Sequence, residues 1–253
     1  KQMTSHPKAG GDRKSRRSKG QDSQQRLCMI RWIADLGALT AEALAHHQEI
    51  SLASARGRLQ AAVAQRLLAA ERPLRDAPTL YSVTPAGMRA AGCDLEACRV
   101  TPSNARHLVA CAAAAAGLAR CYPDHVVGGE RDLRRQERDH GARLASALLG
   151  RGPNGQSLLH RPDLVLWPAH ISVGSLPLAV EVELTVKAPA RLEAICRAWA
   201  RCELIAGVLY LAAPEVERPL QRAIGRAQAR SRVIALPLGC IPGPIDKAIP
   251  SAA

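Results

Sequence analysis

Residues 180–187 carry the strongest chemical pattern of the chain, reading Val-Glu-Val-Glu-Leu-Thr-Val-Lys. Side chains of a β-strand alternate between its two faces. Glu181, Glu183 and Lys187 are therefore expected on one polar face with Thr185, and aliphatic side chains on the other. Two carboxylates on one face of a buried strand repel each other and lose hydration unless a cation joins them. The pattern predicts a site for Mg²⁺ or Mn²⁺, because these cations prefer oxygen ligands.

Two more acids lie near the ends of neighbouring predicted strands. Asp163 occurs in Arg-Pro-Asp-Leu-Val-Leu, a segment that we expect to pair with the carboxylate strand as an antiparallel hairpin. This pairing would place Asp163 opposite Glu181 or Glu183. Glu130 closes a short predicted strand, 125–128, and is a candidate fourth oxygen donor. The candidate catalytic residues are therefore Asp163, Glu181, Glu183, Lys187 and Glu130.

Simpler structural explanations exist for the same residues. Lys187 would be a solvated charge at a strand end, although it is almost the only internal lysine in a chain that otherwise uses arginine. The two glutamates would form salt bridges with nearby arginines, namely Arg161, Arg191 or Arg197. Two histidines are further candidate metal ligands, but isolated histidines more often occupy loops or cores: His160 and His170.

The sequence around these residues, 101–238, predicts one domain of helices and strands. Apolar periodicity and turn residues predict a helix at 103–121, a strand at 125–128, a helix-like charged segment at 131–149, a loop at 150–156, strands at 160–167 and 176–186, a helix at 190–202, a strand at 207–212, a helix at 215–230 and a strand at 232–238. Helix, three strands, helix and strand is the core order of one α/β nuclease architecture. Residues 239–253 are expected to be an irregular tail.

Residues 28–100 predict a winged helix-turn-helix. Predicted helices cover 28–36, 41–47 after an N-cap at Thr40, and a longer segment that Ser51 caps and that runs to about Leu67. A hairpin then joins strands near 67–70 and 80–83, and a further helix starts at Thr84-Pro85.

The helix that Ser51 caps and the hairpin that follows it carry the candidate DNA contacts. The helix turns polar side chains away from its apolar face, as a major-groove helix does, and the hairpin has a basic tip. These residues are Ser54, Arg56, Arg58 and Gln60 on the helix and Arg72 and Arg75 on the hairpin. The alternative is a winged helix that dimerises or docks another protein.

The order of several motifs resembles a known family. Arg-Pro-Asp followed some twenty residues later by EVELTVK is similar to the PD-(D/E)xK nuclease superfamily. The segments ERDLR, HRPDLVL and VEVELTVKAPARLEAICRAW after a winged helix resemble, more specifically, the replication-relaxation family of plasmids and integrative elements. The resemblance implies an α+β or α/β chain in which a restriction-endonuclease-like domain follows the winged helix. It also implies that Asp163 and Glu181 bind the metal.

The chain departs from the superfamily pattern at one position. The superfamily has a lysine two residues after the second acid, where this chain has Glu183. Lys187 is six residues beyond Glu181, which is about 20 Å in an extended strand. Lys187 would then hold a DNA phosphate, or curvature of the chain would return it to the site.

Composition supports a polyanionic partner. The net charge is +13, divided into +6 on residues 1–27, +1 on residues 28–100 and +6 beyond. We expect residues 1–27 to be a disordered tail that adds phosphate contacts or is merely solvated. The absence of Phe argues against RNA recognition by base stacking. The eight cysteines form no Cys-x-x-Cys pair, and Cys111 among alanines is expected to be a core residue.

No apolar run approaches the ~20 residues of a membrane span, so we expect no membrane contact and a reduced cytoplasmic setting. Three functions follow from these features. The first is a metal-dependent endonuclease or nickase acting on double-stranded DNA. The second is a non-cleaving replication or transcription regulator with a degenerate nuclease fold. The third is a protein adaptor, and replication or mobilisation proteins are candidate further partners.

Overall fold

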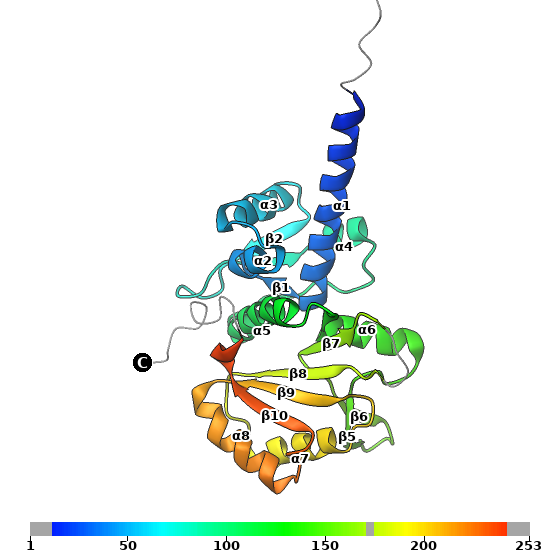
Figure 1. Ribbon diagram of the computed structural model, residues 1–253, viewed down its shortest axis with the longest axis vertical. Coiled ribbons are helices and arrows are strands. Elements are labelled where there is room, and N and C mark those ends of the chain that lie inside the picture. Colours follow the sequence, from blue (N-terminus) through cyan, green and yellow to red (C-terminus); the bar gives the residue numbers. More distant parts are fainter. Residues whose placement is uncertain (1–11, 171–174, 242–253) are drawn as a thin grey trace, which may run out of the picture.

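The computed structural model describes residues 12–170 and 175–241, with side chains from residue 22 onward. It is a mixed α+β structure (Figure 1). The N-terminal part contains four helices and a three-stranded antiparallel sheet of order β1-β3-β2. Its elements are α1 (Asp12–Leu36), β1 (Ala38–Leu39), α2 (Ala41–Gln48), α3 (Leu52–Ala64), β2 (Leu68–Glu71), β3 (Leu80–Val83) and α4 (Pro85–Ala91).

Hydroxyl side chains begin three of these helices, because each accepts a bond from a backbone N–H that the first helical turn leaves unpaired. Thr40 Oγ1 accepts from Ala43 N at 3.2 Å, and Ser51 Oγ accepts from Ser54 N at 3.1 Å. Thr84 caps α4 in the same way. The predicted starts of α2, α3 and α4 are therefore confirmed, whereas α3 ends at Ala64, before the expected Leu67.

The largest difference in this part concerns the basic tail. We expected no regular structure in residues 1–27, but α1 begins at Asp12. Arg, Lys and Gln are good helix formers, and a helix that is already nucleated by packed residues extends at little cost. The prediction was therefore wrong for residues 12–27, and residues 1–11 lie outside the described part of the chain.

The C-terminal part is built around a five-stranded sheet of order β10-β9-β8-β7-β4. The pairs β4–β7 and β7–β8 are antiparallel, whereas β8–β9 and β9–β10 are parallel. Strands β5 and β6 form a separate hairpin. The elements are α5 (Pro102–Cys121), β4 (His125–Gly129), α6 (Glu130–His140), β5 (Ala147–Arg151), β6 (Ser157–His160), β7 (Leu164–Pro168), β8 (Leu178–Glu183), α7 (Pro189–Ala200), β9 (Gly207–Ala212), α8 (Pro214–Arg226), β10 (Val233–Pro237) and the short 3₁₀ helix η1 (Leu238–Cys240).

Three predicted segments differ from the structure. The charged segment 131–149 is not one helix, because α6 ends in a left-handed Gly141 and β5 follows at Ala147. The predicted strand 160–167 is interrupted where Pro162, which cannot donate to a ladder, separates β6 from β7. The carboxylate strand is shorter than expected, since β8 ends at Glu183. Of the predicted irregular tail, residues 242–253 lie outside the described chain.

Helix α5 lies between the N-terminal helices and the sheet, and α7 and α8 cover the opposite face of the sheet (Figure 1). The alanine-rich α5 is buried along Ala110–Ala116 and joins side chains of α1, α2 and α3 to those of the sheet in one continuous core. A second core fills the space between the sheet and α7 and α8. The expected boundary near residue 100 therefore separates two parts that share a core.

Candidate functional site

Asp163 lies immediately before β7 and is fixed at the β7–β8 ladder. Leu164 pairs with Val180, so the same register places Asp163 beside Glu181. Its Oδ2 accepts a hydrogen bond from the backbone N–H of Val182 at 2.8 Å. The expected antiparallel hairpin is present, and the side chain of Asp163 extends its hydrogen bonding by one step.

Glu181 is the most enclosed acid of the group. It is 3% exposed and lies on the face of the sheet that α7 covers. Its Oε1 accepts from His160 Nε2 at 2.7 Å and from Trp199 Nε1 at 3.1 Å. Burial raises the pKa of Glu181, and the charge of Asp163 adds to this effect, whereas His160 opposes it. The structure thus keeps a carboxyl group with a raised proton affinity inside the molecule.

Lys187 contacts one of the acids, Glu183, and does not extend away from them as it would in a continuous strand. After Glu183 the chain leaves β8 and bends at Thr185, and Lys187 Nζ forms an ion pair with Glu183 Oε2. Burial lowers the pKa of Lys187, while the charges of Glu181 and Asp163 raise it, so all three groups act on one another. Of the two positions considered for Lys187, the structure has the one in which chain curvature returns it to the acids.

Glu130 does not join the group through its side chain. It begins α6, and its carboxylate pairs with Arg134 of the same helix. Its backbone N–H donates to the backbone oxygen of Asp163 at 2.9 Å. Glu130 therefore helps to hold the chain at Asp163, but its carboxylate is directed to a neighbouring arginine.

The alternative salt-bridge partners of the glutamates are mostly engaged elsewhere. Arg161 donates to the buried Glu137 at 3.0 Å, and Arg197 pairs with Glu193 on its own helix. His160 is the partner of Glu181, and burial lowers its pKa less than the charge and hydrogen bond of Glu181 raise it. His170 is exposed beyond the end of β7.

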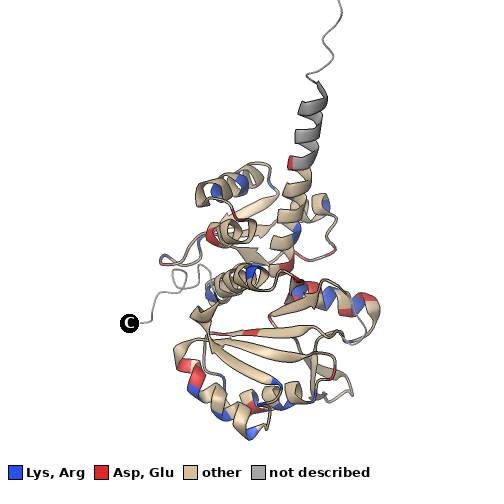
Figure 2. Cartoon of the chain, in the orientation of Figure 1, with Lys and Arg blue, Asp and Glu red and all other residues tan. Residues whose placement is uncertain are grey.

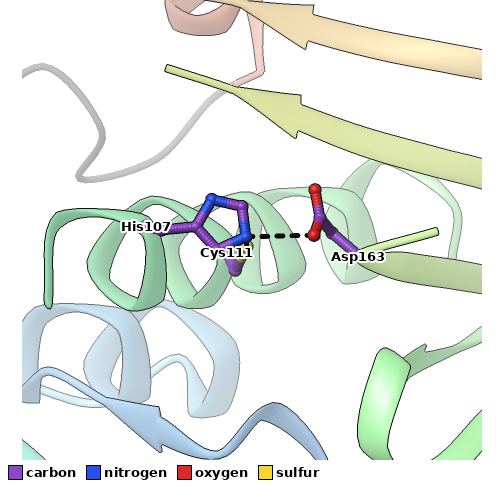
Figure 3. Close-up of side chains that lie close together, drawn as sticks. All are labelled: His107, Cys111 and Asp163. Atoms are coloured by element: carbon purple, nitrogen blue, oxygen red, sulfur yellow. Dashed lines mark hydrogen bonds and ion pairs between the residues drawn. The ribbon is translucent and has the colours of Figure 1, made fainter. Parts of the chain in front are cut away.

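Two residues of the site were missed in the sequence. His107 and Cys111 are four apart on α5, so they share one helix face, and this spacing was the available signal. His107 Nε2 lies 3.0 Å from Asp163 Oδ1 and 3.4 Å from Cys111 Sγ (Figure 3). The hydrogen bonds to Asp163 and then Cys111 raise the pKa of His107 to about 11. Within the described part of the chain, these three residues are the one group of three or more His, Cys, Asp or Glu residues whose ligand atoms lie within 4.8 Å.

The candidate DNA contacts on α3 are all exposed, and each of the three long ones has a partner in the molecule. Arg56 pairs with Glu42 at 3.4 Å. Arg58 Nη1 donates to the side-chain oxygen of Gln48 on α2 at 2.7 Å, and the side-chain amide of Gln60 donates to the hydroxyl of Tyr81. The fourth is Ser54, whose hydroxyl lies 2.8 Å from that of the N-cap Ser51.

The connection between β2 and β3 carries the remaining two candidates. Arg72 and Arg75 are both exposed, and Arg72 Nε donates to the backbone oxygen of Ala77 at 3.3 Å. Basic residues accordingly occur on α3 and on this connection, on the side of the molecule away from α7 and α8 (Figure 2).

Comparison of the chain with protein-family models, with curated proteins and with solved structures finds no match. Along the described residues, no helix has the length and apolar composition that a membrane span requires. The functional argument therefore depends on the geometry of the site and on the charges around it.

Proposed function

We propose that the chain binds duplex DNA through a winged helix-turn-helix and cuts it with a PD-(D/E)xK-like, metal-dependent site. The return of Lys187 to the acids is the observation that carries the proposal. The superfamily pattern needs two acids and a lysine in one place, and the sequence has Glu183 where that lysine is expected. The ion pair of Lys187 with Glu183, beside Glu181, supplies a lysine from another position.

The order of elements supports both halves of this proposal. Helix, short strand, two helices and a two-stranded hairpin are the parts of a winged helix. In the second half, α5, β4, β7, β8, α7 and β9 give the order helix, three strands, helix and strand, with α6 and the β5–β6 hairpin inserted between β4 and β7. We assign α3 to the major groove and the β2–β3 connection to the flanking backbone, where arginine contacts phosphate.

The acids fit a hard divalent cation. Asp163 and Glu181 provide carboxylate oxygens, the ligands that Mg²⁺ and Mn²⁺ prefer, and both oxygens of Asp163 have spare acceptor capacity. Such a cation, when bound, supplies Lewis-acid activation of a water molecule. Val182 N–H orients Asp163, and Trp199 and His160 orient Glu181. Lys187 adds a positive charge beside these acids, where it would attract a DNA phosphate.

A non-cleaving regulator is the second candidate. Two observations favour it: Glu183 stands in place of the superfamily lysine, and the described residues bring Asp163 together with His107 and Cys111 rather than with Glu181 in one ligand group. The adaptor function has less support, because exposed arginine on α3 and on the β2–β3 connection suits a polyanion.

A cleavage assay on supercoiled plasmid, combined with a measurement of duplex binding, distinguishes the three functions. The purified chain is incubated with plasmid and Mg²⁺ or Mn²⁺, with EDTA as the matched control, and binding to a short duplex is measured at low salt. Relaxed or linear product that needs the metal supports the enzyme. Tight binding with no product under either metal supports the regulator, and the absence of binding supports the adaptor.

A further inference from the structure

We propose that His107, Cys111 and Asp163 form a site for a transition-metal ion of the Zn²⁺ type. The proposal goes beyond the nuclease function, because it requires only that these three side chains bind one ion. Asp163 is also a proposed Mg²⁺ ligand, but the other two donors are different, and they select a different class of metal.

The three side chains come from two elements that the core holds together. His107 and Cys111 project from the same face of α5, and Asp163 enters from the start of β7 (Figure 3). The bond from Val182 N–H occupies Asp163 Oδ2 and leaves Oδ1 facing the imidazole. The cluster is thus positioned by a buried helix and a sheet, as an accurately built site requires.

The atoms converge in a way that excludes a cysteine nucleophile with a histidine base. In such a triad, one imidazole nitrogen faces the thiol and the other faces the carboxylate. Here the same atom, His107 Nε2, contacts both Cys111 Sγ and Asp163 Oδ1. Burial also raises the pKa of the Cys111 thiol to about 11, which disfavours a free thiolate nucleophile.

The distances match a tetrahedral ion. With Zn–N and Zn–O bonds of about 2.0 Å and a Zn–S bond of about 2.3 Å, tetrahedral geometry separates N from O by about 3.3 Å and N from S by about 3.5 Å. The corresponding separations in the structure are 3.0 Å and 3.4 Å. These two separations are within a few tenths of an ångström of the tetrahedral values, and all three ligand atoms lie within 4.8 Å of one another.

The donor types and the exposure set the class of ion. One nitrogen, one sulfur and one oxygen suit Zn²⁺ or Co²⁺, whereas Mg²⁺ prefers oxygen alone. Cys111 is 7% exposed, but the side chain of His107 is 42% exposed, so solvent reaches one side of the cluster. The fourth ligand would therefore be a water molecule or an exchangeable group, as in open zinc sites.

Metal binding to the full chain tests this directly. The protein is stripped with EDTA, exchanged into buffer and titrated with Zn²⁺ against a chromophoric chelator, and separately with Co²⁺ as a spectroscopic probe. We expect one ion per chain and a thiolate-to-cobalt charge-transfer band. Cys111→Ser should abolish the band, and His107→Ala should weaken Zn²⁺ binding by about a hundredfold or more.

Cys202→Ser is the matched control. Cys202 is also buried, but its Sγ makes only a weak 3.8 Å contact with the backbone oxygen of Ser146 and lies outside the cluster. This variant should retain both the stoichiometry and the cobalt band. Circular dichroism checks each variant, and Asp163→Asn, which keeps the acceptor for Val182 N–H, replaces any variant that does not fold.

The proposal is overturned if the wild-type chain binds no zinc at stoichiometric concentration, or if folded Cys111→Ser and His107→Ala bind it as wild type does. Both results are independent of the nuclease function. Zinc binding without plasmid cleavage would uphold this site and contradict the nuclease, and Mg²⁺-dependent cleavage without zinc binding would do the reverse.

Discussion

At the scale of single residues, the buried ion pair of Glu183 and Lys187 is the contact that defines the candidate site. Glu183 is 5% exposed and ends β8, while Lys187 returns to it from beyond a bend in the chain. A buried carboxylate without its partner is strongly unfavourable, because the charge has lost its hydration. The pair therefore holds the segment 184–187 against the sheet.

Substitution of Lys187 tests how much the ion pair contributes to stability. Lys187→Met is expected to lower the free energy of unfolding by about 3 kcal/mol at neutral pH, since it leaves the Glu183 carboxylate buried and unpaired. Glu183→Gln in the same chain should recover part of that loss. Urea denaturation of the two single variants and the double variant measures the coupling, and additive effects would show that the ion pair contributes nothing.

Much of this site was predicted from the sequence, and the exceptions have physical causes. Strand periodicity placed Glu181 and Glu183 on one face, and the hairpin placed Asp163 beside them. The expected strand 176–186 was too long and the two positions of Lys187 stayed open, because periodicity does not tell where a strand ends. His107 was missed because its contact with Asp163 depends on how α5 packs against the sheet.

At the scale of elements, the contact between α1 and α6 contains an acid with an unusual proton affinity. Burial, followed by the charge of Asp132, raises the pKa of Asp35 from 3.8 to about 7, although three arginines oppose this shift: Arg135, Arg131 and Arg31. Between these two pH values, the folded chain holds a proton that the unfolded chain does not. The contribution of Asp35 to the free energy of unfolding is therefore complete below pH 4 and is lost as the pH rises through 7.

Asp35→Asn should remove this dependence. The variant is expected to be more stable than wild type above pH 7 and to differ little from it near pH 4, because the amide is neutral throughout. Thermal unfolding between pH 4 and 8 measures the effect. Asp94→Asn, at an exposed carboxylate paired with Arg138, is the control and should change stability little at any pH. Destabilisation of Asp35→Asn that is equal at all pH values would contradict the prediction.

The assignment of α3 to the major groove makes a second prediction at this scale. Arg56→Ala with Arg58→Ala should weaken duplex binding by at least about tenfold and reduce its salt dependence, since each arginine is assigned to DNA. Arg222→Ala with Arg226→Ala, on the far helix α8, removes the same charge and is the control. Equal weakening in both pairs would mean that only net charge matters and that α3 is misassigned.

Most elements themselves were predicted well. Hydroxyl caps and apolar spacing located α2, α3 and the sheet strands to within a few residues. Two differences remain, with different causes. The helix α1 continues into a polar segment because residues near its C-terminal end pack into the core, which is long-range information. The segment 131–149 divides at Gly141, a local left-handed C-cap that the sequence contains but that was not used as a helix end.

At the scale of the whole molecule, the two parts of the chain are expected to unfold together. The alanine face of α5 belongs to the same core as α1, α2 and the sheet. A Cβ at Gly129, the last residue of β4, would lie 2.2 Å from the backbone oxygen of Asp35 at the end of α1. The close approach of these two backbones therefore depends on glycine.

Gly129→Ala should separate the two backbones at a cost of about 3 kcal/mol. Far-ultraviolet circular dichroism follows the loss of helix, and tryptophan fluorescence follows changes around Trp32, Trp167 and Trp199. Both signals should show one transition, shifted to lower temperature. Gly57→Ala, where a Cβ meets nothing within 4 Å, is the control and should not lower stability. Two separate transitions, with only one of them shifted, would contradict a shared core.

The most direct test of the nuclease function compares cleavage and binding in the same preparations. Asp163→Asn and Glu181→Gln keep the size of each side chain but remove the charge that would hold the metal. We predict that Mg²⁺- or Mn²⁺-dependent plasmid nicking falls by about a hundredfold or more in each variant, while duplex affinity stays within about twofold of wild type. Nicking at the wild-type rate by the folded variants would contradict the proposed site.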